Sequence, residues 1–205
     1  MSITTKNDVV SVNAPISRTQ GYTNAYYAIG YLLAHHYATL EAACAMMGNA
    51  IHEINCNPGG AQGWIEPPLP NKGYGILQWT PCSTKIFAYA LNFGLPRSDM
   101  DTQLEYIWWQ ANNEPQNGYI PHPGYETPRN YMAFLRSTNT DVDYLARAFC
   151  INAEKYDATQ ESLDRRAAHA VYLYDLCNND MPVWVDVARK GMPLYMMWMG
   201  ATEGK

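Results

Sequence analysis

The sequence has 205 residues, 47% of them hydrophobic and 13% aromatic, which is typical of one globular domain with short appendages. Its formal net charge is −5, and its fourteen Lys and Arg residues are spread along the chain. This argues against nucleic acid as a partner, because phosphate binding needs clustered basic residues. No stretch reaches the roughly 18 uninterrupted apolar residues of a spanning helix, so we expect no stable membrane insertion.

The cysteines are odd in number and scattered, which predicts free, mostly buried thiols and no disulfide framework. They are Cys44, Cys56, Cys82, Cys150 and Cys177. The first residues lack the basic-then-apolar layout of a signal peptide, so we expect the chain to fold in a reducing cytoplasm. Nothing in the sequence implies a metal or an organic cofactor.

Hydrophobic periodicity predicts a mainly α-helical chain. Residues 24–36 show apolar positions at helical spacing, and Thr39 is a good N-cap for a second helix that runs to Ile54. This second helix is apolar nearly all round, which is typical of a buried helix. The sequence Asn57-Pro58-Gly59-Gly60 ends it.

Further along the chain, the short apolar run 73–80 predicts a small strand or β-hairpin. Further helices are expected at about 83–93, 101–113, 128–138, 141–152 and 160–178. The predicted fold class is therefore mainly α (α+β), with a small β-hairpin beside a cleft. We divide the chain into a polar lead-in (1–20), the main domain (21–180) and a Met- and Trp-rich tail (181–205), which we expect to pack on this domain or on a neighbouring subunit.

Glu53 is the strongest candidate for chemistry. A carboxyl group donates a proton near neutral pH only when desolvation or nearby negative charge raises its pKa. Glu53 lies in the last turn of the predicted buried helix, at the negative end of the helix dipole and just before a Gly/Pro-rich loop where a cleft can open. The alternative is a structural Glu that pairs with an arginine such as Arg147 or Arg165.

Two motifs resemble the phage tail lysozyme family. GNAIHEINCNPG, which contains Glu53, is followed about twenty residues later by GYGILQWTP, and lysozyme-like glycosidases share this order of a helical Glu and a Gln-bearing strand. DTQLEYIWW (101–109), AEKYD (153–157) and RRAAHAVYLYDL (165–176) extend the resemblance over roughly residues 24–178. The sequence departs from the family pattern at Ile54, and at Tyr156-Asp157 where the family has a Tyr-Glu pair.

The resemblance implies a lysozyme-like fold and a lysozyme-type glycosidase that cleaves the N-acetylmuramic acid–N-acetylglucosamine backbone of peptidoglycan. It also implies a place in a phage virion, in contact with other tail proteins and acting at the host cell wall. Lytic transglycosylase chemistry is an alternative outcome of the same site. A structural virion component that keeps the fold without catalysis is the alternative function, and Ile54 and the C-terminal tail favour it.

The second catalytic group is less well defined. Glu66 lies in the loop between the two motifs, where lysozymes often carry a second acid, and its alternative is a solvated loop charge. Asp101 and Asp157 are weaker candidates, and the acetamido group of the substrate is another.

We expect Tyr74, Gln78, Trp64 and Tyr119 to contact the sugar chain. Strand alternation would place Tyr74 and Gln78 on one face and Trp79 on the other, in the core. Ordinary loop packing is the alternative for Trp64 and Tyr119.

Two other enzyme classes find weaker support in the sequence. His52 and Cys56 on one helix face resemble part of a zinc-protease signature, but Pro58 ends the helix and no third ligand is placed. A Cys/His peptidase would need a thiol at a strand-to-helix turn beside a base, and no cysteine has this position.

Overall fold

In the computed structural model, which describes residues 4–114, 118–154 and 157–180, the protein is mainly helical. Its α-helices are α1 (Arg18–His36), α2 (Leu40–Ile54), α3 (Ile86–Phe93), α4 (Met100–Asn113), α5 (Tyr131–Leu135), α6 (Val142–Ala153) and α7 (Gln160–Asp180). Single turns of 3₁₀ helix are found at Lys6–Asp8, Gln62–Trp64 and Cys82–Thr84.

Helix α2 is the centre of the fold. It packs against α1, α6 and α7, and of its residues only Glu41, His52 and Glu53 are not buried. The predicted N-cap is confirmed, since the Thr39 side chain accepts a hydrogen bond from the amide of Ala42. A helix enclosed in this way exposes polar groups only at its ends, which directs attention to its C-terminal turn.

A close approach between α2 and α7 depends on Gly48. A Cβ atom at this position would lie 2.6 Å from the backbone nitrogen of Ala170, closer than real Cβ contacts. The absence of a side chain therefore lets α7 lie directly against α2. Because Arg166 precedes Ala170 by about one turn, the same contact brings Arg166 to the C-terminal half of α2.

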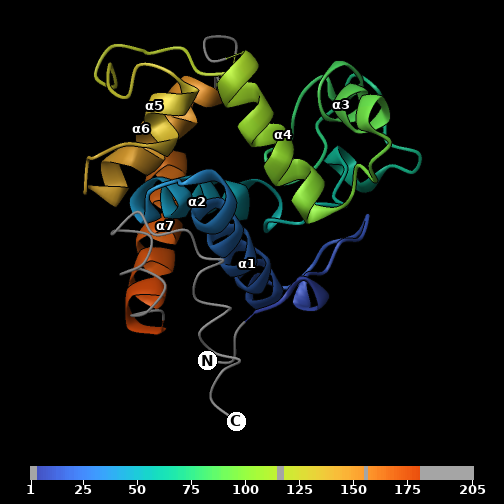
Figure 1. The fold of residues 1–205 in the computed structure, drawn as a ribbon, viewed down its shortest axis with the longest axis horizontal. Coiled ribbons are helices and arrows are strands. Elements are labelled where there is room, and N and C mark those ends of the chain that lie inside the picture. Colours follow the sequence, from blue (N-terminus) through green and yellow to red (C-terminus); the bar gives the residue numbers. More distant parts are fainter. Residues whose placement is uncertain (1–3, 115–117, 155–156, 181–205) are drawn as a thin grey trace, which may run out of the picture.

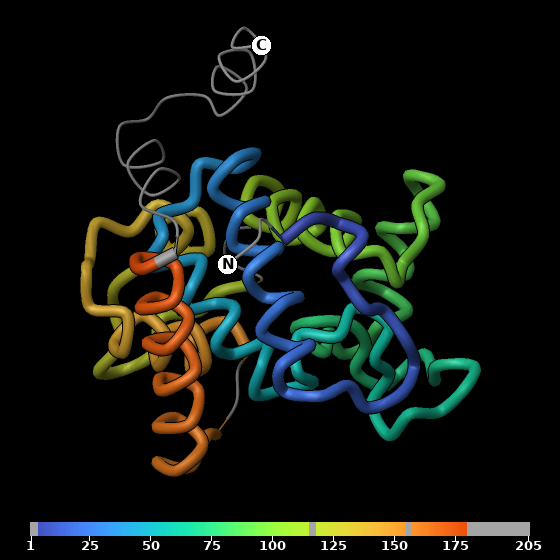
Figure 2. Tube along the Cα trace, turned by 90° about the horizontal axis from the view of Figure 1, so that it is seen from below, coloured from blue at the N-terminus to red at the C-terminus, as the bar shows by residue number. Residues whose placement is uncertain are grey.

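The helices form two sides around α2. Figure 1 shows α3 and its loops on one side, α5 and α6 on the other, and α4 running between them. Figure 2 shows α7 and the loop 59–73 on opposite sides of the molecule.

The predicted β-hairpin at 73–80 is not found in the described residues. In the part of the chain that the structure describes, β pairing is limited to isolated antiparallel bridges, Ala61 with Tyr74 and His122 with Tyr125. Gly75 and Gln78 have φ angles of 79° and 47°, and the Gln78 amide donates to the Gly75 carbonyl at 3.0 Å, so the chain turns where a strand would continue. The predicted alternation of Tyr74 and Gln78 against Trp79 therefore does not apply.

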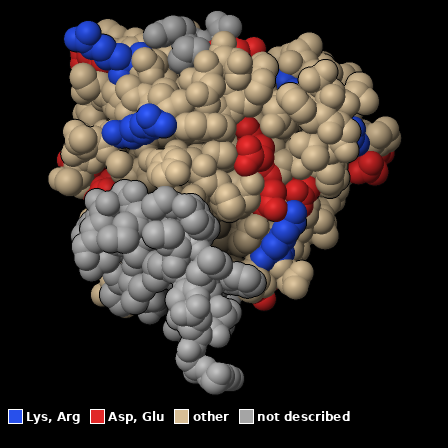
Figure 3. All heavy atoms as spheres, in the orientation of Figure 1, with Lys and Arg blue, Asp and Glu red and all other residues tan. Residues whose placement is uncertain are grey.

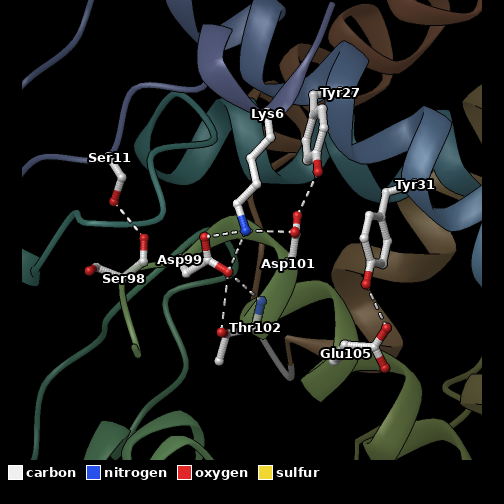
Figure 4. Close-up of polar contacts among 9 residues, drawn as sticks. All are labelled: Lys6, Ser11, Tyr27, Tyr31, Ser98, Asp99, Asp101, Thr102 and Glu105. Atoms are coloured by element: carbon white, nitrogen blue, oxygen red, sulfur yellow. Dashed lines mark hydrogen bonds and ion pairs between the residues drawn. The ribbon is translucent and has the colours of Figure 1, made fainter. Parts of the chain in front are cut away.

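The lead-in is joined to the domain by polar contacts. Lys6 forms ion pairs with Asp99 at 2.9 Å and Asp101 at 2.6 Å, and Tyr27 donates a hydrogen bond to Asp101, as Figure 4 shows. The buried Asn57 side chain accepts from the amide of Val12 and donates to its carbonyl. Residues of the lead-in thus help to fix α1, α4 and the turn after α2.

Two sequence-based expectations concern the surface and the tail. Within the part of the chain described here, no helix combines the length and the apolar character needed to cross a bilayer. On the face drawn in Figure 3, Lys and Arg side chains lie in small separate groups among mostly uncharged residues. The tail 181–205 lies outside the described residues, and its predicted packing is therefore untested.

Candidate active site

The turn that follows α2 places Glu53 at the end of a rigid element. Asn55 and Cys56 adopt left-handed conformations, and the Cys56 amide donates to the Ala50 carbonyl at 2.8 Å, which closes the helix. Pro58 follows two residues after Cys56 and cannot continue the helix. The Glu53 side chain is 25% exposed, in contrast to the buried residues that precede it.

A cleft of about 770 Å³ opens beside Glu53. Its walls come from both sides of the molecule: the end of α2, the loop between α2 and α3, and residues of α4, α5, α6 and α7. A cleft of this size accommodates a ligand larger than a single sugar ring. The residues that line the cleft include His52, Glu53, Trp64, Gln78, Tyr131, Glu154, Ser162 and Arg166.

Arg166 lies under the floor of this cleft, with 3% of its side chain exposed. Its Nη2 forms a very short contact with Glu53 Oε1, and its Nη1 lies 2.5 Å from Glu154 Oε2 and 2.9 Å from Asn49 Oδ1. One guanidinium therefore joins two carboxyl groups and a buried amide. The alternative that Glu53 pairs with an arginine is thus partly confirmed, but the partner is Arg166. The arginines named in the prediction have other partners: Arg147 pairs with Asp143 and Asp164, and Arg165 pairs with Glu161.

Glu154 directly follows α6 and is mostly buried, with 12% of its side chain exposed. Burial raises the pKa of Glu154 to about 8; the Arg166 cation opposes this shift and the neighbouring Glu53 carboxylate adds to it. Its Oε1 is buried and has no hydrogen-bond donor among the described residues. Glu154 was not among the predicted site residues, although the segment AEKYD that carries it was part of the resemblance.

His52 and Ser162 add two uncharged polar groups to the cleft beside Glu53 and Arg166. Ser162 Oγ and His52 Nε2 lie 3.3 Å apart. Burial, and then the positive charge of Arg166, lowers the pKa of His52, so its imidazole is neutral at pH 7. The zinc-protease alternative, with His52 and Cys56 as ligands, finds no support in the structure. Cys56 is fully buried beside Met47, and the described residues contain no group of three metal-ligating side chains.

The cysteines are free and buried, which confirms the prediction from their spacing. Burial raises the pKa of the Cys44, Cys56, Cys82 and Cys150 thiols. A reactive cysteine needs the opposite shift and access to solvent. The structure therefore gives no support to the Cys/His peptidase alternative.

Two of the predicted sugar contacts line the cleft. Trp64 is 38% exposed, in a 3₁₀ turn of the loop after α2. The Gln78 amide nitrogen donates to the Gly60 and Gly75 carbonyls, at 3.1 and 2.9 Å, so its oxygen is the group left for a ligand. Trp79 is 6% exposed and donates to Gln110, so it is a core residue at the cleft wall, as expected.

The other predicted residues lie elsewhere. Tyr119 is fully buried and bonded to Asn152, and Tyr74 is 3% exposed and packs on Phe87, so neither side chain reaches the cleft. Glu66 is an exposed loop residue whose Oε2 accepts from Asn13 at 2.9 Å, and it does not line the cleft.

Asp101, a weaker candidate, is engaged by Lys6 and Tyr27 (Figure 4). The role of all these residues in catalysis or binding stays a prediction.

Comparison with known proteins agrees with this architecture. The family model for phage tail lysozyme matches residues 23–177, which is most of the chain. "Morphogenesis protein 1" of Bacillus phage B103 is 39% identical over 106 residues, which cover 52% of this chain. The match spans only 28% of that relative's own length. On the extent of the family match, the chain belongs to the phage tail lysozyme family.

Proposed function

We propose that this protein is a peptidoglycan-cleaving glycosidase of a phage virion. The single observation that carries the proposal is the position of Glu53: the end of a buried helix, with a partly exposed carboxyl group facing a cleft of about 770 Å³. Membership of the phage tail lysozyme family supports the same reading. The substrate would be the N-acetylmuramic acid–N-acetylglucosamine backbone of the host cell wall.

In this proposal Glu53 protonates the glycosidic oxygen while the bond from that oxygen to the sugar C1 breaks. The developing positive charge at C1 is stabilised by a second group, for which the substrate's acetamido group and Glu66 were both expected. The position of Glu66 outside the cleft favours the acetamido group. Trp64 would stack on a sugar ring, and the Gln78 oxygen would accept a hydrogen bond from a sugar hydroxyl or amide.

Arg166 sets a condition on this mechanism. The Arg166 guanidinium contacts Glu53 and stabilises negative charge at the cleft floor, whereas a general acid must carry a proton when substrate binds. The site must therefore hold a proton close to Glu53 and deliver it there.

The second candidate is a structural component of the tail or virion. The name of the relative, "Morphogenesis protein 1", favours a role in assembly, and the Arg166 contact is compatible with a purely structural Glu53. Both candidates place the protein among other virion proteins.

Digestion of purified peptidoglycan by wild type and Glu53→Gln distinguishes the two candidates. We expect the wild type to release glycan fragments and the variant to lose at least 100-fold of this activity, since one acid contributes about 10²–10⁴-fold. Mass spectrometry of the fragments then identifies the reaction: hydrolysis leaves a reducing end, whereas transglycosylation leaves a 1,6-anhydro end. Glu161→Gln, which removes an exposed carboxylate paired with Arg165, is the matched control. Equal digestion by wild type and Glu53→Gln would leave the structural role as the better account.

A further inference from the structure

The carboxyl groups of Glu53 and Glu154 share one cation. Arg166 contacts Oε1 of Glu53 and Oε2 of Glu154, so each carboxyl group has one oxygen that this guanidinium does not bind in these contacts. With both carboxyls ionised, the three side chains would carry a net negative charge in a site where Arg166 is almost fully buried. With one proton bound, the cluster is neutral, and burial favours the neutral state.

The unsatisfied oxygen shows where this proton fits. Glu154 Oε1 is buried and receives no hydrogen bond from the described residues. A buried carboxylate oxygen without a donor is costly, but a protonated oxygen becomes a donor itself. The acceptor is at hand, because Arg166 contacts both carboxyl groups and so holds Glu53 close to Glu154.

We propose, resting on the function proposed above, that Glu154 holds the catalytic proton and passes it to Glu53 during glycosidic bond cleavage. Glu154 is more enclosed and Glu53 more exposed, so the first is suited to store the proton and the second to reach the substrate. Glu154 thus does not contact the substrate itself; it acts through Glu53 by keeping the proton in position.

The proton balance is closed by water. The proton moves from Glu154 Oε1 to Glu53 and on to the leaving glycosidic oxygen, which departs as a sugar hydroxyl. A water molecule then adds its oxygen to C1, and the proton that it releases returns through Glu53 to Glu154. If the C6 hydroxyl of the sugar attacks C1 in place of water, the proton that it releases follows the same route. If the acetamido oxygen binds C1 first, the proton is released when water or this hydroxyl displaces it.

Other titratable groups that the structure describes around Glu154 do not compete for this proton between pH 7 and 8. Burial raises the pKa of Tyr131 and raises that of Cys150 to about 12, so both stay neutral. His52 lies beside Glu53 and Arg166, and its pKa is lowered. Among the described residues, the charged and titratable groups that interact with Glu154 include Glu53 from α2, Tyr131 from α5, Cys150 from α6 and Arg166 from α7.

The test is the pH profile of peptidoglycan digestion by Glu154→Gln. Glutamine keeps the size of the side chain and can still donate to Glu53, but it has no acidic proton. We expect the alkaline limb of the kcat profile to move down by at least one pH unit, with a loss of at least 10-fold at pH 7.5 and KM within 2-fold of wild type. Glu161→Gln should reproduce the wild-type profile.

An unchanged alkaline limb in active Glu154→Gln overturns the proposal, because a purely structural Glu154 is well replaced by its neutral analogue. Activity of Glu53→Gln would refute the proposed function instead, so the two failures are distinguishable. A second measurement does not depend on the fold of the variant: ¹³C NMR titration of the glutamate carboxyls in the wild type should show one buried carboxyl that titrates above pH 7. If every glutamate titrates below pH 6, the proton is not stored there.

Discussion

Replacement of Arg166 by methionine tests the charge arrangement at the cleft floor. Methionine fills much of the space of the arginine stem, so packing changes little while the positive charge is lost. Glu53 and Glu154 are then left side by side, only 25% and 12% exposed, without a counter-ion, and Asn49 Oδ1 loses a donor. The perturbation therefore isolates the electrostatic part of the cluster.

The expected cost follows from this burial. Removal of one partner from a buried ion pair lowers stability by about 3–5 kcal/mol, because a buried charge is left uncompensated. For a domain of about 150–250 residues, 1 kcal/mol corresponds to about 2–4 °C in Tm, so we expect Arg166→Met to lower Tm by about 6–20 °C near pH 7.5. At pH 5 the difference should be smaller, since protonation of the carboxyl pair then removes the negative charge that has lost its counter-ion.

Calorimetry or circular dichroism melting of wild type, Arg166→Met and Arg165→Met gives the result. Arg165 is the adjacent residue, is 65% exposed and pairs with exposed Glu161, so its loss should change stability by less than about 1 kcal/mol. The double variant Arg166→Met/Glu53→Gln should recover part of the lost stability. Equal small effects of the two arginine variants, or a larger Arg166 effect in acid than at pH 7.5, would refute the electrostatic argument.

Three further predictions concern packing, proton binding and substrate contact. Gly48→Val should lower the free energy of unfolding, measured in urea, by about 2 kcal/mol or more, because the new side chain clashes with Ala170. The control Gly30→Ala, which has open space around its Cβ position, should be neutral or slightly stabilising, and equal effects of the two variants would contradict the close helix contact. The pKa of Glu154 is raised from 4.5 to about 8 in the folded state, so the folded protein holds a proton that the unfolded chain releases. The free energy of unfolding of the wild type should therefore fall as pH rises from about 4.5 to 8. If Glu154→Gln shows the same dependence of stability on pH, this prediction is wrong. Trp64→Ala should raise KM for a soluble glycan by about 3- to 10-fold with little change in kcat, as expected for the loss of a stacking contact of about 0.5–1.5 kcal/mol. An unchanged KM would show that Trp64 does not contact the substrate.

The sequence predicted the helices well because their apolar spacing and caps are local signals. Helix α2 was expected to begin after Thr39 and to end before Pro58, and it does so. The helix expected at 24–36 begins earlier, at Arg18, because Ser17 caps it by accepting from the Gln20 amide. Helix α5 is shorter than expected, since Asn130 caps it and it ends at Leu135.

The β-hairpin predicted at 73–80 was wrong because the apolar composition of this segment is typical of a strand, whereas its conformation is set by contacts with residues distant in sequence. The Ile76 amide donates to the Gln103 side chain, and the same side chain leaves no room for a Cβ at Gly75. The buried aromatic Tyr119 illustrates the same limit: an aromatic residue in a loop can lie in a groove or in the core, and composition does not distinguish these positions.

By itself, the sequence determined the helical class, the buried character of α2 and the candidacy of Glu53 at its end. Only the tertiary structure decided which groups surround that carboxyl. Neighbouring residues on a helix point about 100° apart, so the choice between Arg165 and Arg166 depends on which face of α7 meets α2, and the contact at Gly48 fixes that face. Glu154 joins the cluster from the end of α6 for the same reason: helix packing, which no local pattern encodes, brings distant charges together.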